Sequence, residues 1–267
     1  MADALALYFR LVGAQIRSQL QYRASFALDL LATFGFGFVD FLAVLIIFDN
    51  VPTLDGWTLH EVAFLYACSS LSFSIVDLFI GHLDLFSRMI RDGTFDVVLV
   101  RPRGSLFQVI AADFALRRIG RIVIGAIIFG FALTGVETDW NPARVAMVGV
   151  MLIAGGLIFA SVWVAGTTIA FWTVEGGEFT NAFTSGGNFL AQYPISIYGE
   201  WLRRFLAFVV PMAFVCYFPA LYVLDKEDLL GFPRALQFLS PLVAVAAAVA
   251  AGVIWTFAVR RYRSVGS

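Results

Sequence analysis

The sequence predicts an all-α integral membrane fold with six transmembrane helices, an N-terminal interfacial amphipathic helix and cytoplasmic termini, all within one transmembrane domain over 1–267. The first reason is composition. Of the 267 residues, 60% are hydrophobic and only 14% are charged, against about 25% charged residues in soluble domains. The second reason is a series of apolar runs long enough to cross a bilayer. The third is the uneven distribution of arginine between those runs.

The N-terminal segment 1–23 has the pattern of a helix lying in the membrane interface. Apolar residues at helical spacing form one stripe, and polar residues fall on the opposite side. The stripe consists of Leu5, Tyr8, Phe9, Val12, Ile16 and Leu20, opposite Arg10, Arg17 and Gln21. No short apolar core followed by a small-residue cleavage site is present, so we expect the segment to be retained.

Six apolar runs are expected to span the membrane, since about 20 mostly apolar residues cross the hydrocarbon. They are 24–49, 60–84, 106–134, 143–173, 205–224 and 239–260. The third run is interrupted by Arg117, Arg118 and Arg121, so only 122–134 of it is expected to be deeply embedded.

Arginine and lysine orient these spans. Of the 18 Lys and Arg residues, 15 lie before the first span, within 85–121, within 174–204 or after the last span. Only Arg144, Lys226 and Arg234 fall in the other connections. The positive-inside rule therefore predicts that both termini, 85–105 and 174–204 are cytoplasmic, and that 225–238 is an outer loop.

The residues of common catalytic sites are missing from the sequence. Lys226 is the one lysine, so no phosphate-binding loop ending in Gly-Lys-Ser/Thr exists. His60 and His82 bracket one span about 33 Å apart and cannot share a metal ion. No serine lies in a G-x-S-x-G elbow, and "GFGFVD" (35–40) has the wrong spacing for an intramembrane aspartyl protease. We therefore expect no enzyme activity, metal or cofactor in this chain. Its net charge of −1 argues against nucleic acid as a partner.

Aspartates inside the predicted spans are the candidates for a substrate pathway. An ionisable group at membrane depth is costly and usually faces protein or a water-filled path. Asp40 is the deepest, about 15 Å from Asn50 at helical rise, and Asp77 lies in the next span. Two interpretations stay open: a polar contact for a cationic substrate, or a protonated carboxylic acid hydrogen-bonded within the protein.

The segment "RMIRDGTFDVVLVRPRGSLFQ" (88–108) has the pattern of a shaped cytoplasmic surface. Gly93 can end one helix, an apolar run follows, and "RPRGS" resets the chain with Ser105 placed to cap the next helix. A plain positive-inside loop explains the arginines but not the apolar run. The pattern therefore predicts an ordered turn–helix–turn unit.

This segment resembles the connection between spans two and three in permease subunits of bacterial type-2 ATP-binding-cassette (ABC) exporters. The resemblance is closest to a branch often encoded with a second related permease and one ATPase. The matching positions are Gly93, Asp96, Leu99, Arg101 and Pro102, followed by "RRIGR". The stretch 174–220 is also similar, with "FW" just before it, "YP" at 193–194 and "VVPMAFVCYFPA" at 209–220.

The resemblance implies where the chain would contact an ATPase. In that family a coupling helix between spans two and three docks on the ATPase, and the connection between spans four and five makes a second contact. The residues implied here are Arg91, Asp92, Gly93, Phe95, Asp96, Arg101, Pro102, Glu175, Gly176, Gly177 and Glu178. The resemblance also implies short re-entrant helices in 229–241, for which an ordinary outer loop is the alternative.

The function that follows is the permease subunit of an ABC exporter, with ATP and Mg²⁺ held by a separate cytoplasmic ATPase. A second permease, identical or related, would complete the pathway in the bacterial plasma (inner) membrane. The 28 phenylalanines suggest a small amphiphilic or apolar cargo, although phenylalanine equally suits a lipid-facing surface. The alternative is a proton- or ion-coupled secondary transporter that uses Asp40 or Asp77. A membrane enzyme or a scaffold protein comes third.

Overall fold

A computed structural model describes residues 2–173 and 176–263, and its regular elements within these ranges are helices throughout. The predicted all-α fold is therefore confirmed. In chain order the helices are α1 (Ala2–Gln21), α2 (Arg23–Asn50), α3 (Leu59–Ile80), η1 (Gly81–Leu85), α4 (Phe86–Arg91), α5 (Thr94–Leu99), α6 (Ser105–Ile110), η2 (Leu116–Arg118), α7 (Ile119–Leu133), α8 (Pro142–Thr167), η3 (Thr168–Phe171), α9 (Gly176–Ala191), η4 (Ile195–Ile197), α10 (Glu200–Phe208), η5 (Met212–Phe214), α11 (Tyr217–Val223), η6 (Arg234–Phe238) and α12 (Ser240–Arg261).

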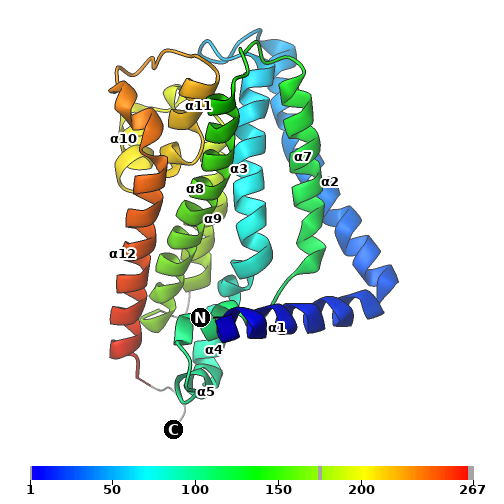
Figure 1. Cartoon of the computed structure of the whole chain (residues 1–267), viewed down its shortest axis with the longest axis vertical. Coiled ribbons are helices and arrows are strands. Elements are labelled where there is room, and N and C mark those ends of the chain that lie inside the picture. Colours follow the sequence, from blue (N-terminus) through cyan, green and yellow to red (C-terminus); the bar gives the residue numbers. More distant parts are fainter. Residues whose placement is uncertain (1, 174–175, 264–267) are drawn as a thin grey trace.

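The long helices run side by side along the long axis of the molecule, and the short ones gather at its two ends (Figure 1). Helices α4 and α5 lie at one end, which we call the α5 end, and α1 lies across that end. Helices α10 and α11 lie at the opposite end, which we call the α11 end. Helix α12 finishes at the α5 end, whereas α2 begins on the opposite side of the molecule, at the far end of α1.

Within residues 2–173 and 176–263, four helices are long and apolar enough to cross a membrane. They are Arg23–Asn50 (α2), Leu59–Arg91 (α3 continued by η1 and α4), Pro142–Phe171 (α8 continued by η3) and Ser240–Arg261 (α12). The pair Glu200–Phe208 and Met212–Val223 would make a fifth if taken together, but its two helices are bent by 71°. The expectation of six spans is thus not confirmed and stays a prediction.

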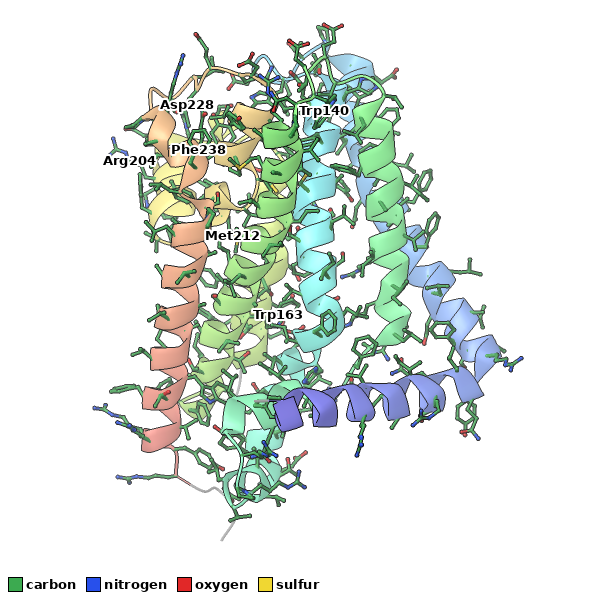
Figure 2. The ribbon with its side chains drawn as sticks, in the orientation of Figure 1. Trp140, Trp163, Arg204, Met212, Asp228 and Phe238 are labelled. Atoms are coloured by element: carbon green, nitrogen blue, oxygen red, sulfur yellow. The ribbon has the colours of Figure 1, made fainter. Side chains whose placement is uncertain are left out.

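The region 174–224 differs from the arrangement expected from hydropathy. Helix α9, expected within a connection, packs along α8 and α3 inside the bundle. The run 205–224, expected as a straight span, is divided by the 71° bend near Pro211. Arg204 accordingly lies at the α11 end, the same end as Asp228 and Phe238 (Figure 2). With Arg204 at the α11 end, the excess of arginine on the predicted cytoplasmic side is smaller than the sequence suggests, but the majority of the arginines still lie toward the α5 end.

The polarity of α9 explains why hydropathy does not reveal it. Polar side chains on one face of α9 form hydrogen bonds to α3, so a helix with many polar residues can still pack against the bundle. Ser69 Oγ donates to Asn188 Oδ1 at 2.9 Å, and Gln192 Nε2, just after the helix, donates to Ser70 Oγ at 3.1 Å. A run of serines on α3 therefore provides the partners that α9 needs.

Helix α3 is the centre of the bundle. In its most apolar window 78% of the residues are buried, whereas the corresponding figure for α2 is 11%. Its start is fixed by a capping box, in which Thr58 N donates to Glu61 Oε2 at 2.7 Å and Glu61 N donates to Thr58 Oγ1 at 3.5 Å. The other helices pack around it, and α2 leaves most of its surface free.

Helix α1 is fixed to the α5 end by side-chain hydrogen bonds. Gln15 Nε2 donates to the carbonyl of Ala112 at 2.9 Å, and Gln19 Nε2 donates to the carbonyl of Phe114. The backbone N–H of Leu116 donates to Gln19 Oε1 at 3.0 Å. The helix is therefore part of the folded unit, while its position in a membrane interface remains a prediction.

Close contact between α2 and α7 generates a stability prediction. A Cβ atom at Gly120 would lie 2.6 Å from the carbonyl oxygen of Leu30 and 2.3 Å from Thr33 Oγ1, whereas Gly130 on the same helix has no atom within 4 Å. We expect Gly120→Ala to lower the apparent melting temperature of the detergent-purified protein, because α7 must move off α2. Gly130→Ala is the matched control and should be neutral or slightly stabilising, since alanine favours helix by about 1 kcal/mol over glycine. Equal melting temperatures for the two variants would contradict this packing.

Candidate functional site

The predicted turn–helix–turn unit is present at the α5 end. Helix α4 ends at Arg91, and Asp92 follows it with its N–H bonded to the carbonyl of Arg88 at 2.8 Å. Gly93 then adopts φ = 66°, the left-handed conformation that glycine takes without strain. This reverses the chain so that α5 can pack back against α4.

Helix α5 is anchored through one phenylalanine. Phe95 is 0% exposed and lies at the centre of an aromatic cluster. Its ring centroid is 5.2 Å from that of Phe86, 5.4 Å from Phe171 and 5.3 Å from Tyr262. Trp255 completes the set, which we call the Phe95 cluster.

The Phe95 cluster joins α5 to three of the long helices. Phe86 is the first residue of α4, which follows α3 and η1 along the chain. Phe171 is the last residue of η3, which follows α8, and Trp255 belongs to α12. Trp255 Nε1 also donates to Ser105 Oγ at the start of α6, at 3.2 Å. A displacement of α5 would therefore also displace α3, α8 and α12 where these helices reach the α5 end of the molecule.

The opposite side of this unit is exposed. Val97 and Val100 are 52% and 82% exposed. With Leu99, Arg91, Arg101 and Pro102, all exposed, they form what we call the α5 face. Asp96, the remaining predicted residue of this helix, is partly buried.

The return from α5 to α6 is held in shape by Gln108. Its Nε2 donates to the carbonyl of Val98 at 3.0 Å and to the carbonyl of Arg103 at 2.8 Å. Arg101 and Pro102 are thereby presented on a defined loop. A groove of about 630 Å³ runs beside them and reaches Gln15 of α1.

The second predicted contact segment begins α9. Glu175 lies outside the described residues, and Glu178 is exposed. A Cβ at Gly176 would be 2.6 Å from the N atom of Ala170, and one at Gly177 would be 2.8 Å from the carbonyl oxygen of Asp84. The glycines therefore let α9 start tightly against η3 and η1, at the same end of the molecule as α5.

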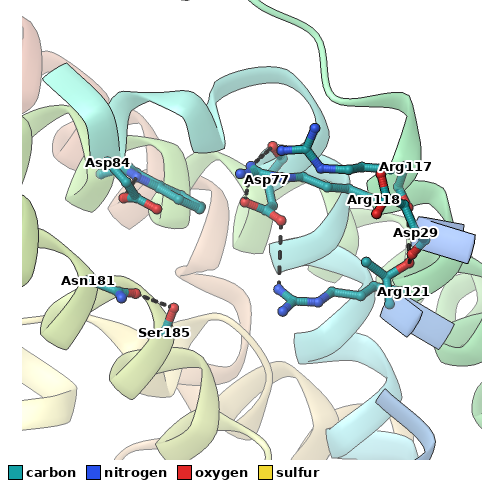
Figure 3. A network of polar contacts seen from close by, with 10 residues as sticks. Asp29, Asp77, Asp84, Arg117, Arg118, Arg121, Asn181 and Ser185 are labelled. Atoms are coloured by element: carbon teal, nitrogen blue, oxygen red, sulfur yellow. Dashed lines mark hydrogen bonds and ion pairs between the residues drawn. The ribbon is translucent and has the colours of Figure 1, made fainter. Parts of the chain in front are cut away.

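Asp77 is bound in a buried ion cluster at the end of α3 (Figure 3). Arg118 donates both to the Asp77 carboxylate and, at 2.7 Å, to the Asp77 carbonyl. Arg121 Nη1 is 3.7 Å from Asp77 Oδ2. Only glycine fits at Gly81, because a Cβ there would overlap both Arg118 and the Asp77 carboxylate. The structure thus places Asp77 in a charge cluster that links α3 to the start of α7.

Asp40 is placed differently, in the wall of a polar cavity of about 160 Å³ between α2, α3, α7 and α9. Asp77 is not among the residues that line this cavity. The polar residues that line it beside Asp40 are Tyr66, Ser70, Ser74, Arg121, Ser185, Asn188 and Gln192. Sequence reasoning did not assign the seven to a site, although the serine run in α3 and the low hydropathy of 180–192 were signals for it.

The histidines and cysteines are accounted for by packing. His60 stacks on Phe131 with ring centroids 4.9 Å apart, and His82 Nε2 is 2.7 Å from the carbonyl oxygen of Val109. Cys68 and Cys216 are buried thiols. Across 2–173 and 176–263, no three His, Cys, Asp or Glu side chains are grouped as metal ligands would be.

Comparison with known proteins finds one match to a family. The family model described as ABC-2 family transporter protein matches residues 34–266, which covers both the α5 unit and the polar cavity. No curated protein and no solved structure matches the chain.

The burial of Phe95 predicts its contribution to stability. Phe95→Ala removes a fully buried ring, and we expect it to lower the free energy of unfolding by about 3 kcal/mol through the cavity it leaves. The measurement is denaturant unfolding of the purified protein, followed by tryptophan fluorescence. Val97→Ala on the same helix is the control and should change stability little, because that side chain is exposed. A Phe95→Ala protein as stable as this control would contradict the anchoring role.

Proposed function

The chain belongs to the ABC-2 family of transporter proteins, and from this premise we propose that it is the permease subunit of an exporter powered by a separate ATPase. Family membership supports a membrane component without catalytic activity of its own. The sequence has no phosphate-binding loop, so ATP and Mg²⁺ would be bound by the partner.

One observation carries this proposal: the α5 face is exposed while its helix is anchored by the Phe95 cluster. An exposed apolar patch with arginines at its edge suits contact with another protein. A partner that moves the α5 face would pull on Phe95 and, through it, on α3, α8 and α12. This is how closure of an ATPase on ATP would shift the helix bundle between two states.

The start of α9 supports a second contact at the same end. Glu178 is exposed there, next to the tightly packed Gly176 and Gly177. Two separate contact points would let the ATPase rotate the α5 end instead of only pressing on it.

The remaining partners and the location follow from surface and charge. Helix α2 leaves most of its apolar surface free, which supports contact with lipid and with a second permease, identical or related. The arginine excess at the α5 end supports a cytoplasmic position for that end in a bacterial plasma (inner) membrane. The cargo would be a small amphiphilic or apolar molecule moved outward.

A secondary transporter that uses intramembrane aspartates is the competing function. Asp77 is bound by Arg118 and Arg121, which leaves it less available as an ion carrier, whereas Asp40 makes no ion pair with the residues that the structure describes. Co-purification separates the two functions. We expect a tag on this chain to recover a soluble ABC ATPase under gentle detergent. Recovery of the chain without any ATPase would favour the secondary transporter.

The α5 face predicts which substitutions uncouple the complex. We expect Arg91→Ala and Arg101→Ala each to weaken ATPase binding about tenfold, the effect of losing one charge-assisted contact. Membrane insertion should be unchanged, because both side chains are exposed. The measurement is the ATPase-binding affinity of the purified chain, with Arg260→Ala on α12 as the control. Affinities that match the control for both variants would overturn the assignment of the α5 face.

A further inference from the structure

The polar cavity between α2, α3, α7 and α9 holds two opposite charges that do not pair with each other. Asp40 and Arg121 both line it. Within the described part of the chain, Asp40 makes no ion pair, and the carboxylate nearest to Arg121 is Asp77, at 3.7 Å. Asp40 is exposed, and Arg121 shares Asp77 with the closer Arg118, so each charge can take a ligand as an additional partner.

The charge on Arg121 is in surplus. Asp77 already has a closer partner in Arg118, which binds both its carboxylate and its carbonyl. The cluster thus contains one carboxylate and two guanidinium groups. The Arg121 side chain is also 44% exposed, against 20% for Arg118. Arg121 therefore brings positive charge to one part of the cavity wall, while Asp40 brings negative charge to another.

Neutral hydrogen-bonding groups of α9 and α3 complete the wall. Asn188 is fixed by Ser69, and Gln192 is fixed by Ser70. Each amide carries both a donor and an acceptor, so it can bind a ligand beyond the bond that fixes it. Ser185, held by Asn181 at 2.6 Å, is a further acceptor in the wall. The cavity is therefore suited to a strongly polar group.

The size of the cavity limits what it can hold. Its volume of about 160 Å³ corresponds to about five water molecules at about 30 Å³ each. That is enough for a headgroup and too little for a whole amphiphile. Phe73, Ile124 and Phe189 line the same cavity and offer an apolar continuation for a tail.

We propose that this cavity binds the zwitterionic headgroup of an amphiphilic cargo, with the cationic group at Asp40 and the anionic group at Arg121. The proposal rests on the function proposed above, since it names the chemical class of the cargo. A purely cationic or purely anionic ligand would satisfy one charge and leave the other without a partner.

Four amphiphiles with one tail length test the proposal. Dodecylphosphocholine is zwitterionic, dodecyltrimethylammonium cationic, dodecyl phosphate anionic and dodecyl maltoside neutral. The purified chain in dodecyl maltoside is titrated calorimetrically with each of the first three below its micelle concentration. We expect dodecylphosphocholine to bind about tenfold more tightly than either singly charged amphiphile, as expected when one more charge is satisfied.

Substitution of either charged residue should remove part of this preference for the zwitterion. Asp40→Asn should lose the preference for the zwitterion over dodecyl phosphate, and Arg121→Gln should lose it over dodecyltrimethylammonium. Asp49→Asn on α2 and Arg260→Gln on α12 are matched controls and should keep wild-type selectivity. Asp40→Glu and Arg121→Lys retain the charges and should retain the preference, which guards against a substitution that only disturbs folding.

Three results would overturn the proposal: no saturable binding, equal affinity for all charged amphiphiles, or unchanged selectivity in both Asp40→Asn and Arg121→Gln. The titration uses this chain without an ATPase. If no amphiphile shows the expected binding but an ATPase is recovered by co-purification, the proposed cargo class is rejected and the exporter function is retained. Zwitterion binding without ATPase recovery would reject the exporter and keep the site.

Discussion

The fold depends on neutralising a carboxylate where α3 meets the α5 end. A charged Asp77 in this position must be paired, because an uncompensated buried charge costs several kcal/mol. Arg118 provides the pairing from 41 residues further along the chain and also binds the Asp77 carbonyl. The absence of a side chain at Gly81 makes room for it. This ion cluster fixes where α7 begins, and the segment before α7 in turn carries the contacts to α1.

The two ends of the bundle are held together by different interactions. At the α5 end, rings of the Phe95 cluster interlock, and such packing transmits displacement because it leaves little free space. At the α11 end, charged pairs join the connections: Lys226 Nζ is 2.9 Å from Glu61 Oε2, and Arg144 Nη2 is 3.2 Å from Asp225 Oδ2. The side chains of Lys226 and Glu61 are mostly buried, at 21% and 16% exposure, whereas Asp225 of the second pair is 83% exposed. Aromatic rings also pack at the α11 end, where Phe214 contacts Phe218, so these ion pairs add to a buried core at that end.

Hydropathy predicted four of the long helices because α2, α3, α8 and α12 are apolar over a full membrane width. It did not reveal α9, whose polar side chains are satisfied by serines of α3 more than 100 residues earlier. The α5 unit was predictable, since the turn at Gly93 and the apolar run after it are local signals. The pairing of Asp77 with Arg118 and the shared cavity of Asp40 and Arg121 were not, because contacts between distant helices leave no periodic trace in one sequence.

The hydrogen bonds of α1 have a consequence for biogenesis. Gln15 and Gln19 bind backbone groups of residues 112–116, which leave the ribosome almost 100 residues after α1 does. Helix α1 therefore cannot take its final place until α2, α3 and the α5 unit have been made. In the meantime the predicted apolar stripe of α1, opposite its arginines, would hold it at the membrane surface. Helix α1 is thus made before its binding partners, and it can dock only after the chain up to residue 116 has folded.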